Sequence, residues 1–192
     1  ASCLVGSEMC IRDSLYSAGI TDVQVRPVAG SLTDHYDPRT KTVNLSQDIY
    51  GQTSLAAVGV AAHECGHAIQ HATNYAPLEM RSAIVPAANI GSSLSWPLFL
   101  IGLFAGIRPL VTAGIVLFSL AVLFQLVTLP VEVNASARAL KMLQSTGILG
   151  ADETKGARKV LTAAAMTYVA ALAASILQLL RLVILAGGRR DD

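Results

Sequence analysis

Twenty consecutive residues without a charged side chain, LVTAGIVLFSLAVLFQLVTL at positions 110–129, constrain the fold more than any other feature of this sequence. About twenty apolar residues in a helix are what the hydrocarbon core of a bilayer requires. A buried helix in a soluble core is the alternative. A chain of 192 residues, however, is too small to cover a helix that is apolar on every side. The run therefore predicts a membrane-spanning helix.

A second uncharged run precedes it. Residues 83–107 carry no charge, although Pro86 and Pro97 interrupt them, and Arg108-Pro109 forms the boundary with the run that follows. Two apolar runs joined by so short a connection are typical of two antiparallel spans. We therefore expect a transmembrane hairpin over residues 83–129.

The C-terminal part of the chain and the overall composition agree with this interpretation. Hydrophobic residues make up 53% and charged residues only 14% of the chain, whereas a soluble domain carries about 25% charged residues. Residues 130–159 are polar and helix-favouring, with a break near 147–150. Residues 160–186 are apolar except for Arg181, whose stem can reach the headgroups, so they predict a C-terminal transmembrane helix before a polar tail at 187–192. A net charge of +1 without a Lys/Arg cluster excludes nucleic acid as a partner.

The block at residues 15–76 is polar enough to lie in water. Alternating apolar and polar residues over 21–28 predict a strand. Asp37-Pro38 is typical of a turn, and the strand-like residues 42–45 follow it, so we expect a hairpin. A long helix is expected over residues 55–73.

The first residues have a different origin in our interpretation. LVGSEMCIRDS, at residues 4–14, is the translation of a nucleotide string that resembles an adaptor used in transposase-based sequencing libraries. We therefore expect residues 1–14 to be translated adaptor in place of the native start, and we assign them no functional role. Recovery of these residues from the organism's own protein would refute this expectation.

The chemistry of the chain centres on HECGH in the helix expected over 55–73. His63 and His67, four residues apart, share one helical face, where both ring nitrogens can bind one zinc ion. Glu64 is offset around the helix and is placed to accept a proton from a water molecule that the zinc activates. The motif thus predicts a catalytic metal site, with surface helix residues as the alternative.

A catalytic zinc normally has a third protein ligand. His71 lies eight residues after His63, which rotates it about 80° around the helix and away from a shared ion. Glu79 follows Pro77 closely, as residues at a helix start do. Glu132 is the better candidate because an isolated carboxylate at the end of a membrane span is costly unless a cation pairs with it.

Four blocks of the sequence together carry a family resemblance: SLTDHYDPRTKTVNLS, AAHECGHAIQHA, RSAIVPAANIGS and LPVEVNASARALKML. In this order and spacing, over about residues 20–185, they resemble the YugP-like membrane zinc metallopeptidases, a gluzincin-type group. The resemblance implies His63 and His67 as zinc ligands, Glu64 as the base and Glu132 as the third ligand. It also implies a further membrane helix before the soluble block, which we expect the adaptor sequence to have displaced.

The outer partners of the two histidines stay open. In related membrane gluzincins an acid four residues after the third-ligand glutamate orients a ligand histidine. That position is Ser136 here, and Asn134 and Asn89 are further candidates. For Asn89, hydrogen bonding between membrane helices is the alternative.

Substrate contacts are also open. We expect an extended peptide to align with residues 42–46 or with the strand that contains His35. A donor to the developing oxyanion would come from His35, Tyr36 or Arg138.

These observations predict an α+β fold, predominantly helical, in which a small zincin-like catalytic block with a hairpin is joined to a transmembrane helix bundle. The expected function is that of a membrane-embedded zinc endopeptidase. It would act on a peptide or protein substrate, membrane proteins included, with the lipid bilayer as its other partner. A non-catalytic membrane scaffold with structural zinc is the alternative, and it would need a fourth ligand such as His71 or His35.

Charges near the helix ends predict the orientation in the membrane. Positively charged residues favour the cytoplasmic side. Arg108, Arg189 and Arg190 lie on the side away from the expected zinc site. We therefore expect an integral, multi-pass protein with its active site on the cytoplasmic face, the side that carries Arg81, Arg138, Lys141, Lys155, Arg158 and Lys159.

Overall fold

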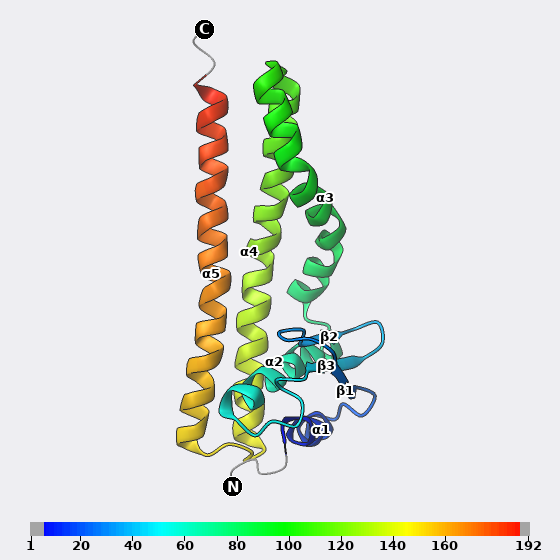
Figure 1. Ribbon diagram of the computed structural model, residues 1–192. Coiled ribbons are helices and arrows are strands. Elements are labelled where there is room, and N and C mark those ends of the chain that lie inside the picture. Colours follow the sequence, from blue (N-terminus) through cyan, green and yellow to red (C-terminus); the bar gives the residue numbers. More distant parts are fainter. Residues whose placement is uncertain (1–5, 189–192) are drawn as a thin grey trace. The chain divides into compact units, whose positions relative to one another are not determined.

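The computed structural model of the protein describes residues 6–188, and Figure 1 shows their helices and strands. The elements in chain order are α1 (Ser7–Ser17), β1 (Gln24–Val28), β2 (His35–Asp37), β3 (Thr42–Ser46), α2 (Leu55–Ala72), α3 (Ala76–Ala105), α4 (Arg108–Ser145) and α5 (Ala151–Gly187). They form two compact units. The first comprises Ala1–Tyr75 and Val131–Ala165, and the second comprises Ala76–Pro130 and Met166–Asp192.

The first unit contains a three-stranded sheet with β3 in the middle. β2 and β3 form the expected antiparallel hairpin. Its turn is held by Asp37, whose carboxylate accepts hydrogen bonds from the Arg39 amide at 2.9 Å and from the Thr40 hydroxyl at 2.8 Å. β1 starts at Gln24, later than the alternation suggests, and pairs with β3 in parallel.

Helix α2 is the central helix of this unit. Its first turn is capped by Ser54, whose hydroxyl accepts a hydrogen bond from the Ala57 amide at 3.2 Å. The sheet and α1 both pack against it. The apolar core combines side chains of these elements with the neighbouring parts of α4 and α5; its fully buried members include Ile11, Val43, Leu45, Val58, Ala61, Ala62, Cys65, Ala139, Leu143 and Ala157.

Three helices, α3, α4 and α5, are long and apolar enough to cross a membrane. In the most apolar 18-residue stretch of each helix, only 22%, 17% and 6% of the residues are buried, so most of these side chains need an apolar surrounding other than the protein itself. Pro86 and Pro97 lie inside α3 without ending it, as proline does in membrane helices. The connection to α4 is at Gly106, which adopts a positive φ of 70°, so that Arg108 starts α4.

The predicted fold class is confirmed in its coarse form: the described residues are predominantly helical, with a small sheet and three long apolar helices. The zincin-like character of the first unit stays a prediction. α4 continues through Pro130, and residues 151–159 belong to the same helix as the apolar run that follows. Residues 1–5 of the segment expected to be adaptor lie outside the described residues, and the origin of that segment stays a prediction. Residues 189–192 of the tail also lie outside the described residues.

Candidate metal centre

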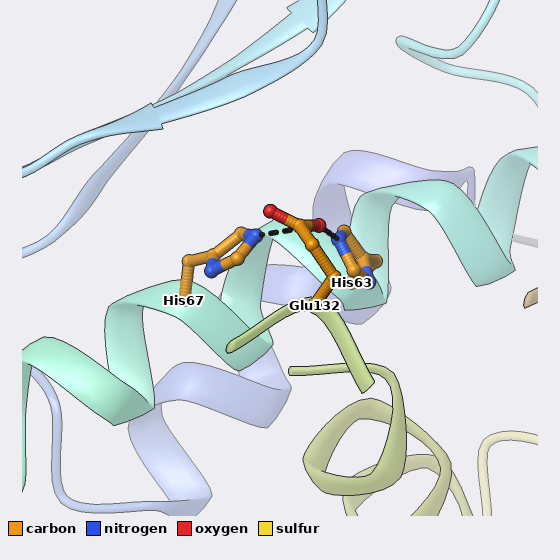
Figure 2. Close-up of side chains that lie close together, drawn as sticks. All are labelled: His63, His67 and Glu132. Carbon is orange, nitrogen blue, oxygen red and sulfur yellow. Dashed lines mark hydrogen bonds and ion pairs between the residues drawn. The ribbon is translucent and has the colours of Figure 1, made fainter. Parts of the chain in front are cut away.

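Two histidines of α2 and one glutamate of α4 meet in the first unit. Figure 2 shows the side chains of His63 and His67 pointing from α2 toward the carboxylate of Glu132. Glu132 Oε2 lies 3.1 Å from His63 Nε2 and 3.6 Å from His67 Nε2. The three candidate ligand atoms all lie within 4.8 Å of one another. The structure thus brings together the three residues that the sequence proposes as ligands.

The donor set fits a zinc ion. Two atoms bound at about 2.0–2.1 Å to one tetrahedral ion lie roughly 3.3 Å apart, and the two distances from Glu132 Oε2 lie on either side of that value. Glu132 is only 3% exposed, and a buried carboxylate needs a positive partner. Imidazole nitrogen with carboxylate oxygen is also a ligand combination that zinc binds.

Glu64 lies on α2 beside these ligands and is buried. Burial raises the pKa of its carboxyl above the usual value, and the charge of Glu132 adds to the rise, while His67, His63 and the backbone amide of Tyr36 oppose it. A carboxyl with a raised pKa holds a proton more strongly than a surface carboxylate does. The surroundings of Glu64 thus differ from those of a surface carboxylate.

Each candidate ligand histidine has a polar partner on its outer nitrogen. His63 Nδ1 lies 3.0 Å from the hydroxyl of Ser136, the position that the resemblance indicated. His67 Nδ1 lies 3.0 Å from Oε1 of Gln70, a residue that the sequence analysis did not single out. Its signal in the sequence is its position three residues after His67, which places it on the same helical face.

The carboxylates also act on His67. Burial alone lowers its pKa, but the hydrogen bond to Glu132 and the charges of Glu64 and Glu132 raise it above the ordinary value. A histidine in this setting attracts positive charge, either as a proton or as a metal ion.

The other histidines of the chain are engaged elsewhere. His71 Nδ1 is hydrogen-bonded to the Tyr36 hydroxyl at 2.9 Å. Burial raises the pKa of Tyr36 to about 12, with contributions from nearby aspartates, so its phenol stays protonated. His35 contacts the carbonyl of Thr33 at 2.7 Å and the amide of Asn44 at 3.1 Å.

Three further candidates have other surroundings. Asn89 and Glu79 belong to the second unit and are exposed. Arg138 donates from Nε to Asn134 at 2.7 Å and stacks its guanidinium over Tyr75 at 5.6 Å. These contacts with Asn134 and Tyr75 support a structural role for this side chain.

The meeting of α2 and α4 depends on Gly66, between Cys65 and His67. A Cβ atom at this position would overlap the backbone oxygen of Ala135 and would lie 2.8 Å from its carbonyl carbon. No real Cβ contact is that short, so only glycine permits this approach of the two helices. The approach brings the histidines of α2 within reach of Glu132.

Replacement of Gly66 by alanine is therefore expected to separate α2 from α4. We expect a loss of about 1–3 kcal/mol in the free energy of unfolding, as for other overpacked sites, together with weaker zinc binding. Denaturant unfolding in detergent and zinc titration measure the two effects.

Gly59→Ala is the matched control in the same helix. Its Cβ would meet only Ala157 Cβ at 3.9 Å, and alanine in place of helical glycine stabilises by up to about 1 kcal/mol. Equal stability of the two variants would contradict the close approach.

Comparison with known proteins gives the class to which this architecture and site belong. The family described as "Putative neutral zinc metallopeptidase" matches residues 2–187, nearly the whole chain, and the chain belongs to this family. One relative is the "Putative membrane protease YugP" of Bacillus subtilis (strain 168). The two are 48% identical over 174 residues, which cover 91% of this chain and 77% of the relative. The resemblance seen in the four sequence blocks is thereby confirmed. No solved structure matches the chain significantly.

Proposed function

We propose that this protein is a membrane-embedded zinc endopeptidase that hydrolyses peptide bonds in peptide or protein substrates, membrane proteins among them. The observation that carries the proposal is the meeting of His63, His67 and Glu132 within 4.8 Å, beside the buried carboxyl of Glu64. Three protein ligands with one position left open are the pattern of catalytic zinc, whereas structural zinc has four.

The alternative, a scaffold with structural zinc, needs a fourth ligand. Over residues 6–188 the cluster contains no fourth histidine, cysteine, aspartate or glutamate. His71 and His35, the two residues named for that role, have hydrogen-bond partners of their own. These contacts favour the peptidase.

The roles of the residues follow from their surroundings. Zinc held by His63, His67 and Glu132 would supply Lewis acidity, which polarises a carbonyl and lowers the pKa of water to about 7. Glu64 accepts the proton of the attacking water and returns it to the leaving amine, as a buried carboxyl with a raised pKa can do in both directions. Ser136 and Gln70 orient the two imidazole rings.

The order of the strands supports one position for the substrate. β3 is paired on both sides, so residues 42–46 offer no edge to a peptide. β2 lies at the edge of the three-stranded sheet, and the backbone amide of its Tyr36 acts on the Glu64 carboxylate. We therefore place an extended substrate along β2, where its backbone would pass close to Glu64.

The proposal is tested by removing and returning the metal. Protein purified in detergent is expected to contain about one zinc per chain and to cleave casein or a membrane-protein substrate. Cleavage should stop when a chelator removes the zinc and return when zinc, but not magnesium, is added. A short peptide with methylated backbone amides cannot donate the hydrogen bonds of strand pairing. It should therefore resist cleavage if pairing with β2 aligns the substrate. Cleavage that persists without metal would exclude the proposal.

The same assay tests the orientation. We propose that the protein is multi-pass with its site on the cytoplasmic face, because the positively charged residues near the helix ends favour that side. Inside-out vesicles should then cleave an added peptide, and sealed right-side-out vesicles should not. The reverse result would place the site outside.

A further inference from the structure

Gln70 is a polar side chain with no exposed surface, and it makes three hydrogen bonds inside the first unit. Its Oε1 lies 3.0 Å from His67 Nδ1. Its Nε2 lies 2.8 Å from the backbone oxygen of Val131 and 3.0 Å from Oδ1 of Asn134, both on α4. Gln70 therefore connects one candidate ligand to the backbone that precedes Glu132.

The direction of these hydrogen bonds is fixed by groups that cannot change roles. The Val131 carbonyl can only accept, so it requires the amide nitrogen of Gln70 to face α4. Asn134 presents its oxygen to Gln70 because that oxygen also accepts from Arg138 Nε at 2.7 Å, and a guanidinium can only donate. The carbonyl oxygen of Gln70 is consequently the atom that faces His67.

We propose that Gln70 is a positioning residue that keeps the ring proton of His67 on Nδ1 and thereby leaves Nε2 free to bind the metal. Oε1 of Gln70 accepts a hydrogen bond and never donates one, so the tautomer with the proton on Nε2 would lose this bond. Arg138 acts at the far end of the chain Arg138–Asn134–Gln70–His67 by orienting Asn134. This inference rests on the proposed function for the role of His67 as a metal ligand.

The same contacts fix the ring in space. Gln70 bonds to the residue next to Glu132 and to the ring of His67, so the two candidate ligands share one intermediary. A ring oriented in this way loses little freedom when the metal binds. Gln70 thus acts on the site through His67 and through the backbone of Val131.

The first test is Gln70→Met, which keeps the length of the side chain and removes both polar atoms. We expect zinc affinity, measured by competition with a chelator of known affinity, to fall by about 10–100-fold, the range for lost outer partners of ligand histidines. Nitrogen-15 spectra of histidine-labelled, zinc-loaded protein should show a slowly exchanging Nδ1 proton on His67. That signal should disappear in Gln70→Met. A purely structural role would not move the proton signal.

A second pair of variants tests whether Asn134 accepts its hydrogen bonds from Gln70 and Arg138. Asn134 accepts in both of its contacts, so Asn134→Asp keeps both and should bind zinc about as tightly as the wild type. Asn134→Leu has a similar volume but accepts nothing, and its zinc affinity should fall. Thr154→Val is the control, because the buried Thr154 makes a partly buried hydrogen bond in the same unit, to the Gly150 carbonyl at 2.9 Å, which this change removes. It should leave zinc affinity unchanged.

Two results would overturn the role of Gln70: wild-type zinc affinity with a retained Nδ1 proton signal in Gln70→Met, or equal zinc loss in Asn134→Asp and Asn134→Leu. Failure of the proposed function gives a different outcome. If the wild-type protein binds zinc but cleaves no peptide, the peptidase is excluded, while the zinc affinities of these variants still decide the role of Gln70. A wild-type protein that takes up no zinc would exclude both.

Discussion

Replacement of Glu132 by alanine is expected to remove zinc and activity together. The variant keeps both imidazoles of α2 but loses the buried carboxylate that lies 3.1 Å and 3.6 Å from their Nε2 atoms. Loss of a direct ligand should cost more than the roughly 10–100-fold that lost outer partners cost in metal affinity. Metal analysis of the purified protein and chelator competition measure the effect, and peptide cleavage should fall to background.

Glu79→Ala is the informative control for this experiment. Glu79 is the other carboxylate that the sequence offers as a third ligand, and it lies exposed in the first turn of α3. Its loss should change neither zinc content nor cleavage. Full zinc occupancy in Glu132→Ala would show that Glu132 is not a ligand. Zinc loss in Glu79→Ala would identify Glu79 as the third ligand instead.

Glu64→Gln is expected to separate metal binding from catalysis. Glutamine has the shape of glutamate, so the buried position stays filled and the two histidines and Glu132 keep their contacts. It cannot accept the proton of the attacking water, and removal of a general base typically lowers the rate by about 10²–10⁴-fold. We expect zinc content near that of the wild type and a loss of cleavage in this range, seen in kcat.

The control is a carboxylate-to-amide change away from the site. Asp152 is exposed at the start of α5, where it pairs with Lys155. Asp152→Asn should retain both zinc and activity. If Glu64→Gln cleaved as fast as Asp152→Asn, another group would have to be the base.

The candidate ligands can be predicted from the sequence by two arguments. One is the spacing of residues along a helix, and the other is the free-energy cost of an unpaired carboxylate at the end of an apolar span. His63 and His67 share a face through helical periodicity alone. Glu132, 65 residues beyond His67, was found because a carboxylate at the end of an apolar span requires a partner. The resemblance to a known family pointed to the same residue, and the structure brings the three together.

Other features depend on tertiary contacts that the sequence does not display. α3 passes through Pro86 and Pro97, because the local preference of proline to end helices is overridden in an apolar surrounding. The parallel pairing of β1 with β3 joins segments separated by the hairpin, which alternation cannot reveal. Gln70 looked like one polar residue among many, since its importance lies in contacts with α4.

The two outer partners of the histidines differ in one chemical respect, which has a consequence for loading and unloading the site. Gln70 can only accept from His67, but the Ser136 hydroxyl near His63 Nδ1 can either donate or accept by rotating. His63 therefore keeps a hydrogen bond whichever of its two nitrogens carries hydrogen. One ring is held in a single tautomer by its outer partner, whereas the other can change tautomer without losing its outer hydrogen bond when the ion arrives or departs.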